Sequence, residues 1–314
     1  MDEISGVGSG ASASAKYDVI IVGAGPAGLS AALILGRSRR TVLVCDHGKP
    51  RNAASHALHG FLTRDGIHPR EFLSTGRKEL ERYATVQLRD IEVTDAECSS
   101  DGGFRITFAD GSIGRSRKLL IATGVCDNLP RIEGIEELYG QSVFHCPYCD
   151  GWEVRDQPIA VYGQGARGVG LSLELTAWSR DLILCTDGPA DISEEDRARL
   201  SRNGVSICEA RVTVLEGRDG ILQRIQFDTG QSIARSAMFF TTGQFQQSAL
   251  AIRLGCEINE KGTVRTGKYE STHLSGLYVA GDASRAVQWV IVAAAEGAEA
   301  AFAINTDLIR EDLS

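Results

Sequence analysis

The chain has 314 residues, enough for two domains with separate cores. A hydrophobic share of 43% and a charged share of 24% are ordinary for a globular protein in water. The formal net charge is -8, and no long Lys/Arg-rich run occurs. This balance argues against nucleic acid or an anionic membrane as the main partner, and no apolar run approaches the roughly 18 residues of a membrane span.

The N-terminal residues 1–15 are rich in Gly, Ser and Ala and have neither a basic nor an apolar segment. We expect a flexible tail there and not a signal peptide. Of the eight cysteines, only Cys146 and Cys149 are close in sequence. This scatter favours a reducing cytoplasmic compartment with one special pair over a secreted disulfide framework.

A dinucleotide-binding pattern opens the first unit. A strand over 17–22 runs into the glycine turn 23–28, a helix is predicted over 27–36, and a strand over 41–45 ends at Asp46. An acid about 20 residues after the first glycine completes the fingerprint. The glycines allow close approach to a pyrophosphate at the helix N-terminus, and Asp46 can accept a hydrogen bond from a ribose hydroxyl.

A second unit repeats this pattern later in the chain. A strand over 158–162 precedes the glycine turn 163–168, and a strand over 181–185 follows. The segments before and after this second unit are expected to complete the fold of the first unit. They are a strand over 117–122, a strand over 276–280 and a helix expected over 288–305. We therefore predict an α/β fold with two Rossmann-like dinucleotide-binding domains, the second inserted in the first. The expected division is a tail at 1–15, a first domain at 16–126 and 244–314, and an inserted domain at 127–243.

The pair Cys146 and Cys149 forms a C-x-x-C motif followed by Asp150. Such a pair can cycle between dithiol and disulfide, because its thiolate is readily formed, and the acid can carry the proton. A zinc site needs two more ligands, and no second C-x-x-C or H-x-x-x-H occurs, so no metal is expected. His145, which precedes Cys146, is a candidate for proton transfer, as are His56 and His59.

Together these residues resemble the low-molecular-weight thioredoxin reductases over nearly the whole chain after the tail. The resemblance implies that Cys146 and Cys149 exchange electrons with the flavin ring, with Asp150 as proton donor or acceptor. It also implies a homodimer and a thioredoxin-like protein or small disulfide or dithiol as partner. The residues implied in FAD binding are Gly23, Gly25, Pro26, Ala27, Gly28, Asp46, Asn52, Thr123, Gly124, Gly281, Asp282, Gln288, Trp289 and Val290.

The second glycine turn departs from the family pattern for NADPH. A basic cluster normally follows the next strand, but residues 185–191 read CTDGPAD, and Asp187 would repel a 2′-phosphate. Two interpretations stay open. Asp187 binds the ribose of NADH, or the domain has lost its nicotinamide cofactor and serves as carrier of the cysteines. Gln164 and Arg167 are larger than the usual occupants of such a turn, so we favour weak or absent NADPH use and leave NAD(P)H undecided.

These departures resemble two side branches of the family. One consists of reductase-like flavoproteins that take electrons from elsewhere, such as ferredoxin. The other consists of dithiol oxidases of the gliotoxin and holomycin type, which pass electrons through FAD to oxygen. The leading prediction is an FAD-dependent thiol/disulfide oxidoreductase. The alternatives are a dithiol oxidase and a redox-sensing flavoprotein without turnover.

Overall fold

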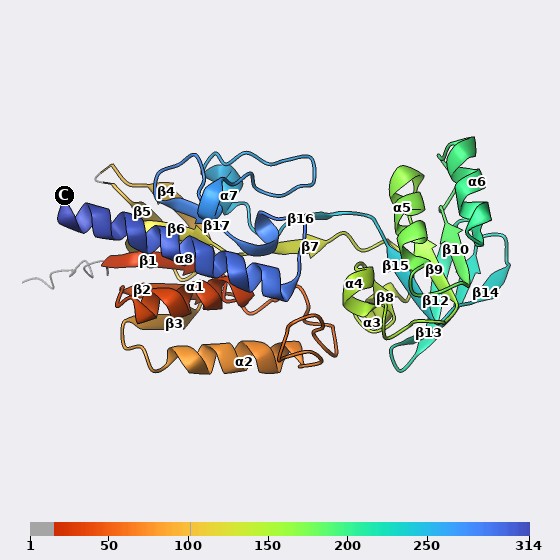
Figure 1. Cartoon of the computed structure of the whole chain (residues 1–314), viewed down its shortest axis with the longest axis horizontal. Helices are drawn as coiled ribbons and strands as arrows, with labels where there is room; N and C mark the ends of the chain where they lie inside the picture. The colour runs from red at the N-terminus through yellow and green to blue at the C-terminus, as the bar shows by residue number, and fades with distance from the viewer. Residues whose placement is uncertain (1–15, 101) are drawn as a thin grey trace, which may run out of the picture.

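The computed structural model describes residues 16–100 and 102–314, which form two lobes joined by a narrow connection (Figure 1). The first lobe is built on a seven-stranded sheet in the order β3-β2-β1-β6-β5-β4, with β17 also paired to β6. Its strands are β1 (Lys16–Val22), β2 (Val42–Asp46), β3 (Val86–Asp90), β4 (Val93–Cys98), β5 (Phe104–Phe108), β6 (Ile113–Ile121) and β17 (Leu277–Val279). Its helices are α1 (Pro26–Arg37), α2 (Pro69–Leu80), α7 (Leu250–Arg253), α8 (Val290–Leu313) and the 3-10 turns η1 (Lys268–Glu270) and η2 (Gly281–Ala283).

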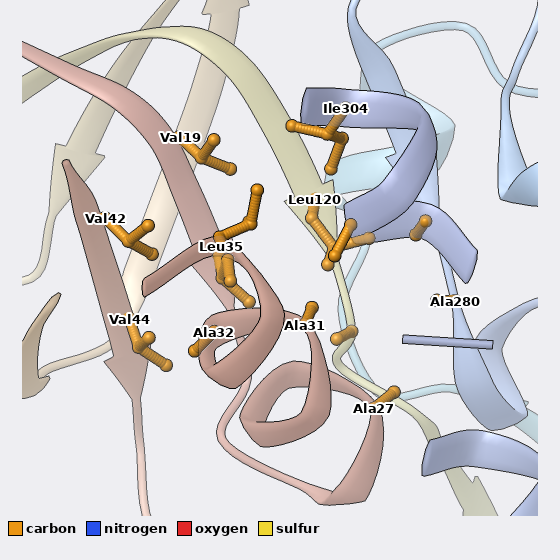
Figure 2. Close-up of a cluster of buried hydrophobic side chains, with 14 of the residues drawn as sticks. Val19, Ala27, Ala31, Ala32, Leu35, Val42, Val44, Leu120, Ala280 and Ile304 are labelled. Carbon is orange, nitrogen blue, oxygen red and sulfur yellow. The ribbon is translucent and has the colours of Figure 1, made fainter. Parts of the chain in front are cut away.

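The core of the first lobe lies between this sheet and the helices α1 and α8. Leu35 of α1 and Ile304 of α8 are fully buried against Val19 and Leu120 of the central strands (Figure 2). The two helices cross in backbone contact, because a Cβ placed at Gly297 would lie 2.0 Å from the carbonyl oxygen of Ala27. This close packing fixes the start of α1, where the first glycine turn lies.

The second lobe is a parallel sheet in the order β11-β10-β9-β15-β8, with a three-stranded antiparallel sheet, β12-β13-β14, packed against it. Alternate residues of β10 separate the two faces. Ile183 packs toward β12 and β13, whereas Leu184 packs toward α5 and α6. The strands are β8 (Val143–Phe144), β9 (Ile159–Tyr162), β10 (Leu182–Cys185), β11 (Val205–Cys208), β12 (Val212–Arg218), β13 (Ile221–Phe227), β14 (Ser232–Ala234) and β15 (Ala237–Phe240). The helices are α3 (Ile135–Leu138), α4 (Pro147–Asp150), α5 (Gly165–Leu175) and α6 (Glu194–Arg202).

Two antiparallel strands, β7 (Val125–Asp127) and β16 (Gln244–Gln246), connect the lobes. The predicted α/β class with two Rossmann-like units is confirmed by this architecture. The boundaries expected at 127 and 244 fall within this connection, and the division into an FAD domain and an inserted domain stays a proposal. The last helix differs from its predicted span, since it begins at Val290 and runs to Leu313. No helix within 16–100 and 102–314 is both long and apolar enough to cross a membrane.

Candidate functional site

A cavity of about 620 Å³ lies where the two lobes face each other, a size typical of ligand pockets. Of the site residues predicted from the sequence, all except Gly28, Cys146 and the candidate His56 line it. The first lobe contributes Gly23, Gly25, Pro26, Ala27, Asp46, Asn52, Thr123, Gly124, Gly281, Asp282, Gln288, Trp289 and Val290. The second lobe contributes His145, Tyr148, Cys149 and Asp150. The fold thus brings the redox motif and the first glycine turn to one place.

The first glycine turn forms an open backbone cradle. A Cβ at Gly28 would lie 1.9 Å from the carbonyl oxygen of Gly23, so this glycine permits the tight turn behind the cavity. At Gly25 an added Cβ would meet no atom within 4 Å. No side chain caps the start of α1 at this point. A helix N-terminus left open beside a cavity is suited to an anionic group such as a pyrophosphate.

Two polar side chains beside the cradle test whether a dinucleotide fits. The hydroxyl of Thr123 is buried and has no hydrogen-bond partner, a situation that costs about 1–3 kcal/mol unless a ligand supplies one. Asp46 lines the cavity and forms an ion pair with Arg77. Its other oxygen lies 3.4 Å from the amide nitrogen of Ala24, leaving acceptor capacity toward the cavity. These residues fit the phosphate and ribose of a dinucleotide.

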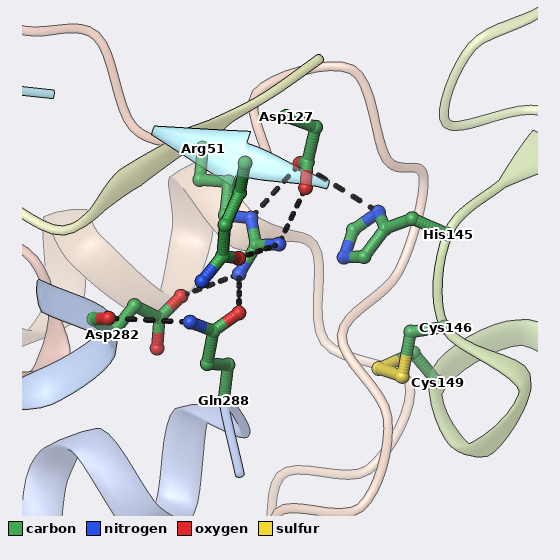
Figure 3. The surroundings of a disulfide bond; sticks show 8 residues. Arg51, Asp127, His145, Cys146, Cys149, Asp282 and Gln288 are labelled. Carbon is green, nitrogen blue, oxygen red and sulfur yellow. Dashed lines mark hydrogen bonds and ion pairs between the residues drawn. A yellow bond between two sulfur atoms is a disulfide. The ribbon is translucent and has the colours of Figure 1, made fainter. Parts of the chain in front are cut away.

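Arg51 organises a buried ionic cluster beside this cradle (Figure 3). Its guanidinium donates to Asp127 through Nε at 2.9 Å and Nη2 at 2.5 Å, a bidentate pair. Through Nη1 it also donates to Asp282 at 2.9 Å and to Gln288 at 2.7 Å. Burial, the largest single cause, raises the pKa of the Asp127 carboxyl, but the hydrogen bonds and charges of its neighbours, Arg51 first among them, together outweigh it and the pKa is lowered. Arg51 therefore ties the first lobe to the connecting strand β7.

The redox pair follows β8, and Cys146 and Cys149 are joined as a disulfide with their Cα atoms 5.3 Å apart. Cys146 caps the short helix α4, and Cys149 lies in it. Cys149 lines the cavity, whereas Cys146 does not. Tyr148, between them, is 60% exposed and packs edge-on against Trp178 and beside Trp289 of the other lobe. One of the two disulfide cysteines thus lines the cavity, and the residue between them belongs to an aromatic cluster.

Asp150 carries a carboxyl with an unusual proton affinity. Burial raises its pKa to about 7, and the nearby Glu153 adds to this, while His59 opposes it. His59 lies 3.4 Å from Glu153 and 3.5 Å from Asp65. A carboxyl that titrates near neutrality beside a disulfide can both donate and accept a proton. His56 is exposed and does not line the cavity.

His145 is the residue before the first redox cysteine. Burial lowers the pKa of its imidazole to about 4, although Asp127 opposes this, so the ring is uncharged at neutral pH. Its Nδ1 lies 3.7 Å from Asp127, and its ring packs between Tyr139 and Phe240. Figure 3 shows the ring between the Arg51 cluster and the disulfide. His145 is thus placed in the cavity wall next to Cys146.

We call the second glycine turn filled in the sense that the polar side chains beside it are hydrogen-bonded within the protein. The amide of Gln164 donates to the carbonyl of Thr186 at 2.8 Å. One carboxylate oxygen of Asp187 accepts from the hydroxyl of Tyr162 at 2.9 Å, and the other from the amide of Val212 at 2.9 Å. The acid that could have bound a ribose is therefore committed to its own lobe.

Sequence reasoning did not place Arg51 and Asp127 among the site residues. Arg51 lies in a loop, and its partners Asp127 and Asp282 are 76 and 231 residues away in sequence. The only local signal was that Arg51 follows closely on Asp46. Arg285, also outside the predicted site, bridges Glu270 and Glu296, two carboxylates that are buried.

Two nucleotide-type folds around a cavity that a disulfide faces define a dinucleotide-dependent disulfide oxidoreductase. Residues 17–297 match the model of the pyridine nucleotide-disulphide oxidoreductase family, and the chain belongs to this family. A probable thioredoxin reductase of Arthroderma benhamiae is 31% identical over 86% of this chain and 74% of its own length. Thioredoxin reductase tcpT of Claviceps purpurea is 31% identical over 86% of this chain and 88% of its own length.

Solved structures agree with this assignment. The putative thioredoxin reductase TrxB from Bacillus anthracis is 34% identical and superposes with a TM-score of 0.89 over 94% of this chain and 99% of its own. HlmI is 36% identical with a TM-score of 0.90 over 95% and 94% of the two chains. The protein is thus a thioredoxin reductase-like flavin disulfide oxidoreductase, an enzyme class that binds FAD. The open cradle and the unpartnered hydroxyl of Thr123 fit that cofactor.

Proposed function

We propose that Cys146 and Cys149 exchange electrons between FAD and a thioredoxin-like protein or a small disulfide or dithiol. The observation that carries this proposal is that Cys149 lines the same cavity as Gly25 and Thr123. The glycine turn and Thr123 would hold the cofactor, with Asp46 at a ribose and Gln288 and Trp289 at the ring. Bound there, FAD supplies a two-electron carrier beside Cys149.

The chemistry at the disulfide is thiol exchange, here written for a dithiol substrate. A substrate thiolate attacks the sulfur of Cys146, a new S–S bond forms, and the Cys146–Cys149 bond breaks with Cys149 leaving as thiolate. The second substrate thiolate then attacks the substrate sulfur of this mixed disulfide and releases Cys146. The substrate is oxidised by two electrons, and the cysteine pair is reduced. Run backwards, the same steps reduce a disulfide.

Asp150 and His145 would manage the protons of this exchange. Thiol substrates must lose a proton to attack, and the leaving cysteines must gain one. Since the pKa of Asp150 is about 7, its carboxyl can accept the proton of the substrate thiol and can return a proton to the leaving cysteine at neutral pH. His145, beside Cys146 and with a pKa of about 4, would relay this proton through its ring nitrogen without holding it at neutral pH.

NADPH is proposed to be a poor donor for this enzyme. Support comes from Asp187, each of whose carboxylate oxygens accepts a hydrogen bond within the lobe, from Tyr162 and from Val212, and from Gln164, whose side chain is bonded to Thr186. The test is an anaerobic titration of the holoenzyme with NADPH, NADH and reduced ferredoxin. We expect ferredoxin or a dithiol to bleach the flavin absorbance. Bleaching by NADPH at micromolar concentration would refute the proposal.

A dithiol oxidase is the second candidate function, and the filled second turn favours it. If no nicotinamide donor binds, electrons that enter from a dithiol through Cys146 need another acceptor. Oxygen would take two electrons and two protons to give hydrogen peroxide. The test is peroxide release upon adding small dithiols in air. If no dithiol releases peroxide and a donor reduces the flavin, the oxidase function is excluded and the enzyme works as a disulfide reductase.

The role of the cysteine pair is tested by Cys149→Ser, with Cys126→Ser as matched control. Cys126 is a partly buried thiol in β7 that does not line the cavity. We expect Cys149→Ser to bind FAD and to lose thiol turnover, and Cys126→Ser to keep both. Unchanged turnover in Cys149→Ser would exclude the exchange mechanism and favour a redox-sensing flavoprotein.

A homodimer and a cytoplasmic location remain part of the proposal, and light scattering of the holoenzyme tests whether it is a homodimer.

A further inference from the structure

A second pair of cysteines lies in the second lobe, away from the flavin cavity. Cys185 and Cys208 are the last residues of β10 and β11, and they are direct partners in the parallel register. Neighbouring strands lie about 4.8 Å apart. Disulfides span Cα separations of about 4.4–6.8 Å, so the backbone places these two residues within bridging range.

Both side chains point to the same face of the sheet. Cys185 and Cys208 pack with Val212 and Phe227, between the parallel sheet and the antiparallel β12-β13 layer. The residues just before them, Leu184 and Ile207, pack toward the opposite face. Because side chains alternate along a strand, this arrangement sets the two side chains next to each other on that face.

The environment divides the pair into an attacking and a resolving thiol. Cys185 is fully buried, whereas Cys208 lies in the edge strand β11 and is partly exposed. Hydrogen bonds from the thiol of Cys185 and the backbone amide of Ala210 stabilise the thiolate of Cys208 and lower its pKa to about 6. The pKa of Cys185 is raised, first because its own proton is shared with Cys208 and then because of burial.

We propose that Cys185 and Cys208 form a second dithiol site that hydrogen peroxide oxidises to a disulfide. The thiolate of Cys208 attacks one oxygen of the peroxide, the O–O bond breaks, and the sulfenic acid forms as hydroxide leaves and takes up a proton to give water. Cys185 then attacks the Cys208 sulfur, its thiol proton joins the departing hydroxide, and a second water leaves. Two thiols are oxidised by two electrons and one peroxide is reduced to two waters.

The site neighbours the second glycine turn. The amide of Thr186 donates to the carbonyl of Cys208 at 3.0 Å, and Asp187 follows directly. Oxidation would staple β10 to β11 at the end of the sheet that carries the filled nucleotide position. The reaction uses neither FAD nor Cys146 and Cys149, so it stands or fails apart from the function proposed above.

Peptide mapping of the holoenzyme tests the proposal. The enzyme is treated with a small molar excess of hydrogen peroxide, blocked with iodoacetamide and cleaved with trypsin, which separates the two cysteines into peptides 181–197 and 203–211. We expect these peptides to be joined with a mass two hydrogen atoms below their sum. This link should form at least about tenfold more than any link to Cys45 or Cys256, two buried thiols without such a neighbour. Separate peptides with both cysteines alkylated would overturn the proposal.

Two variants assign the roles within the pair. In Cys185→Ser, peroxide should leave a sulfenic acid on Cys208 that dimedone traps. In Cys208→Ser, dimedone labelling of Cys185 should be at least about tenfold weaker than the labelling of Cys208 in Cys185→Ser, because the Cys185 thiol is buried and protonated. Equal labelling of the two would contradict the assignment. The mapping of the unaltered enzyme decides the existence of the disulfide even if a variant fails to fold.

Discussion

The two glycine turns begin from the same sequence signal and end as different sites. In the first, Gly25 faces open space, and Thr123 presents a buried hydroxyl without a partner. In the second, the side chains of Gln164 and Asp187 form hydrogen bonds with other residues of the same lobe. The glycines permit the turn, but the side chains around it decide whether a ligand is needed. The two turns therefore differ in the hydrogen bonding of the side chains beside them, although no side chain caps the start of either helix.

The strongest test of this contrast compares a crowded glycine in α1 with an open one in α5. At Gly28 a Cβ would lie 1.9 Å from the carbonyl oxygen of Gly23, whereas at Gly170 it would meet nothing within 4 Å. We expect Gly28→Ala to lose about 3 kcal/mol of unfolding free energy and its bound FAD. Gly170→Ala should be neutral or more stable by up to about 1 kcal/mol. Urea unfolding and flavin content measure both.

The contrast would fail in either of two ways. Full FAD content in Gly28→Ala would mean that the first turn is not the cofactor cradle. Loss of FAD in Gly170→Ala, with its fold intact by circular dichroism, would mean that the second lobe controls cofactor retention.

The next effect concerns ligand binding without a change in the fold. Gly25 has φ of -73° and free space around it, so Gly25→Val should leave the apoprotein stable. The added side chain enters the cradle, and we expect the FAD dissociation constant to rise about 100-fold, or about 2.7 kcal/mol. A comparison change in the second turn, Gln164→Ala, should alter the FAD dissociation constant by less than about twofold. Fluorescence titration of apoprotein with FAD provides the measurement. Equal effects of the two changes would erase the distinction between the turns.

A smaller effect tests what Asp187 does in the filled turn. Asp187→Ala leaves the amide of Val212 and the hydroxyl of Tyr162 without their acceptor, so we expect a loss of about 2 kcal/mol in unfolding free energy. Asp191→Ala, an exposed acid in the same segment, should stay within about 0.5 kcal/mol. If Asp187→Ala kept its stability and instead lost oxidation of NADH, Asp187 would be a ribose ligand.

The fold could be predicted because its signals are local. Strands rich in Val, Ile and Leu ending in glycine turns, with an acid after the next strand, specify the unit wherever they occur. The helix ending was less predictable. The expected end near residue 305 had no Gly or Pro to enforce it, and α8 continues to Leu313.

The site was predictable only where a motif carried it. Cys149 and Asp150 were found from their spacing, but the raised pKa of Asp150 comes from burial, which no spacing reveals. Arg51 was missed as a site residue because its partners are distant in the chain. Cys185 and Cys208 looked scattered in sequence and become a pair only through the register of β10 and β11. Contacts between residues that the fold brings together from distant parts of the chain cannot be predicted from the periodicity of the sequence.

The smallest expected effect is a change in the pH dependence of stability. It concerns the junction between the two lobes, where α4 of the second lobe faces the cavity. Asp150 has a folded-state pKa of about 7, raised by burial from an ordinary value near 4. A raised folded pKa means that the folded state holds the proton more tightly, so this carboxyl stabilises the fold at low pH. That contribution is full below about pH 4 and is lost as pH rises through about 7.

Between pH 6 and 8 the wild-type protein should therefore lose about 1 kcal/mol of unfolding free energy through Asp150. Asp150→Asn cannot ionise and should lack that part of the slope, whereas Asp156→Asn, an exposed acid just after α4, should keep it. Urea unfolding of the apoproteins at both pH values measures the difference, so that flavin titration does not contribute. Identical slopes in wild type and Asp150→Asn would show that the carboxyl is solvated and ordinary. In that case the cavity at the junction is wetter than its burial indicates, and the proton at the disulfide is carried by His145 or by the substrate itself.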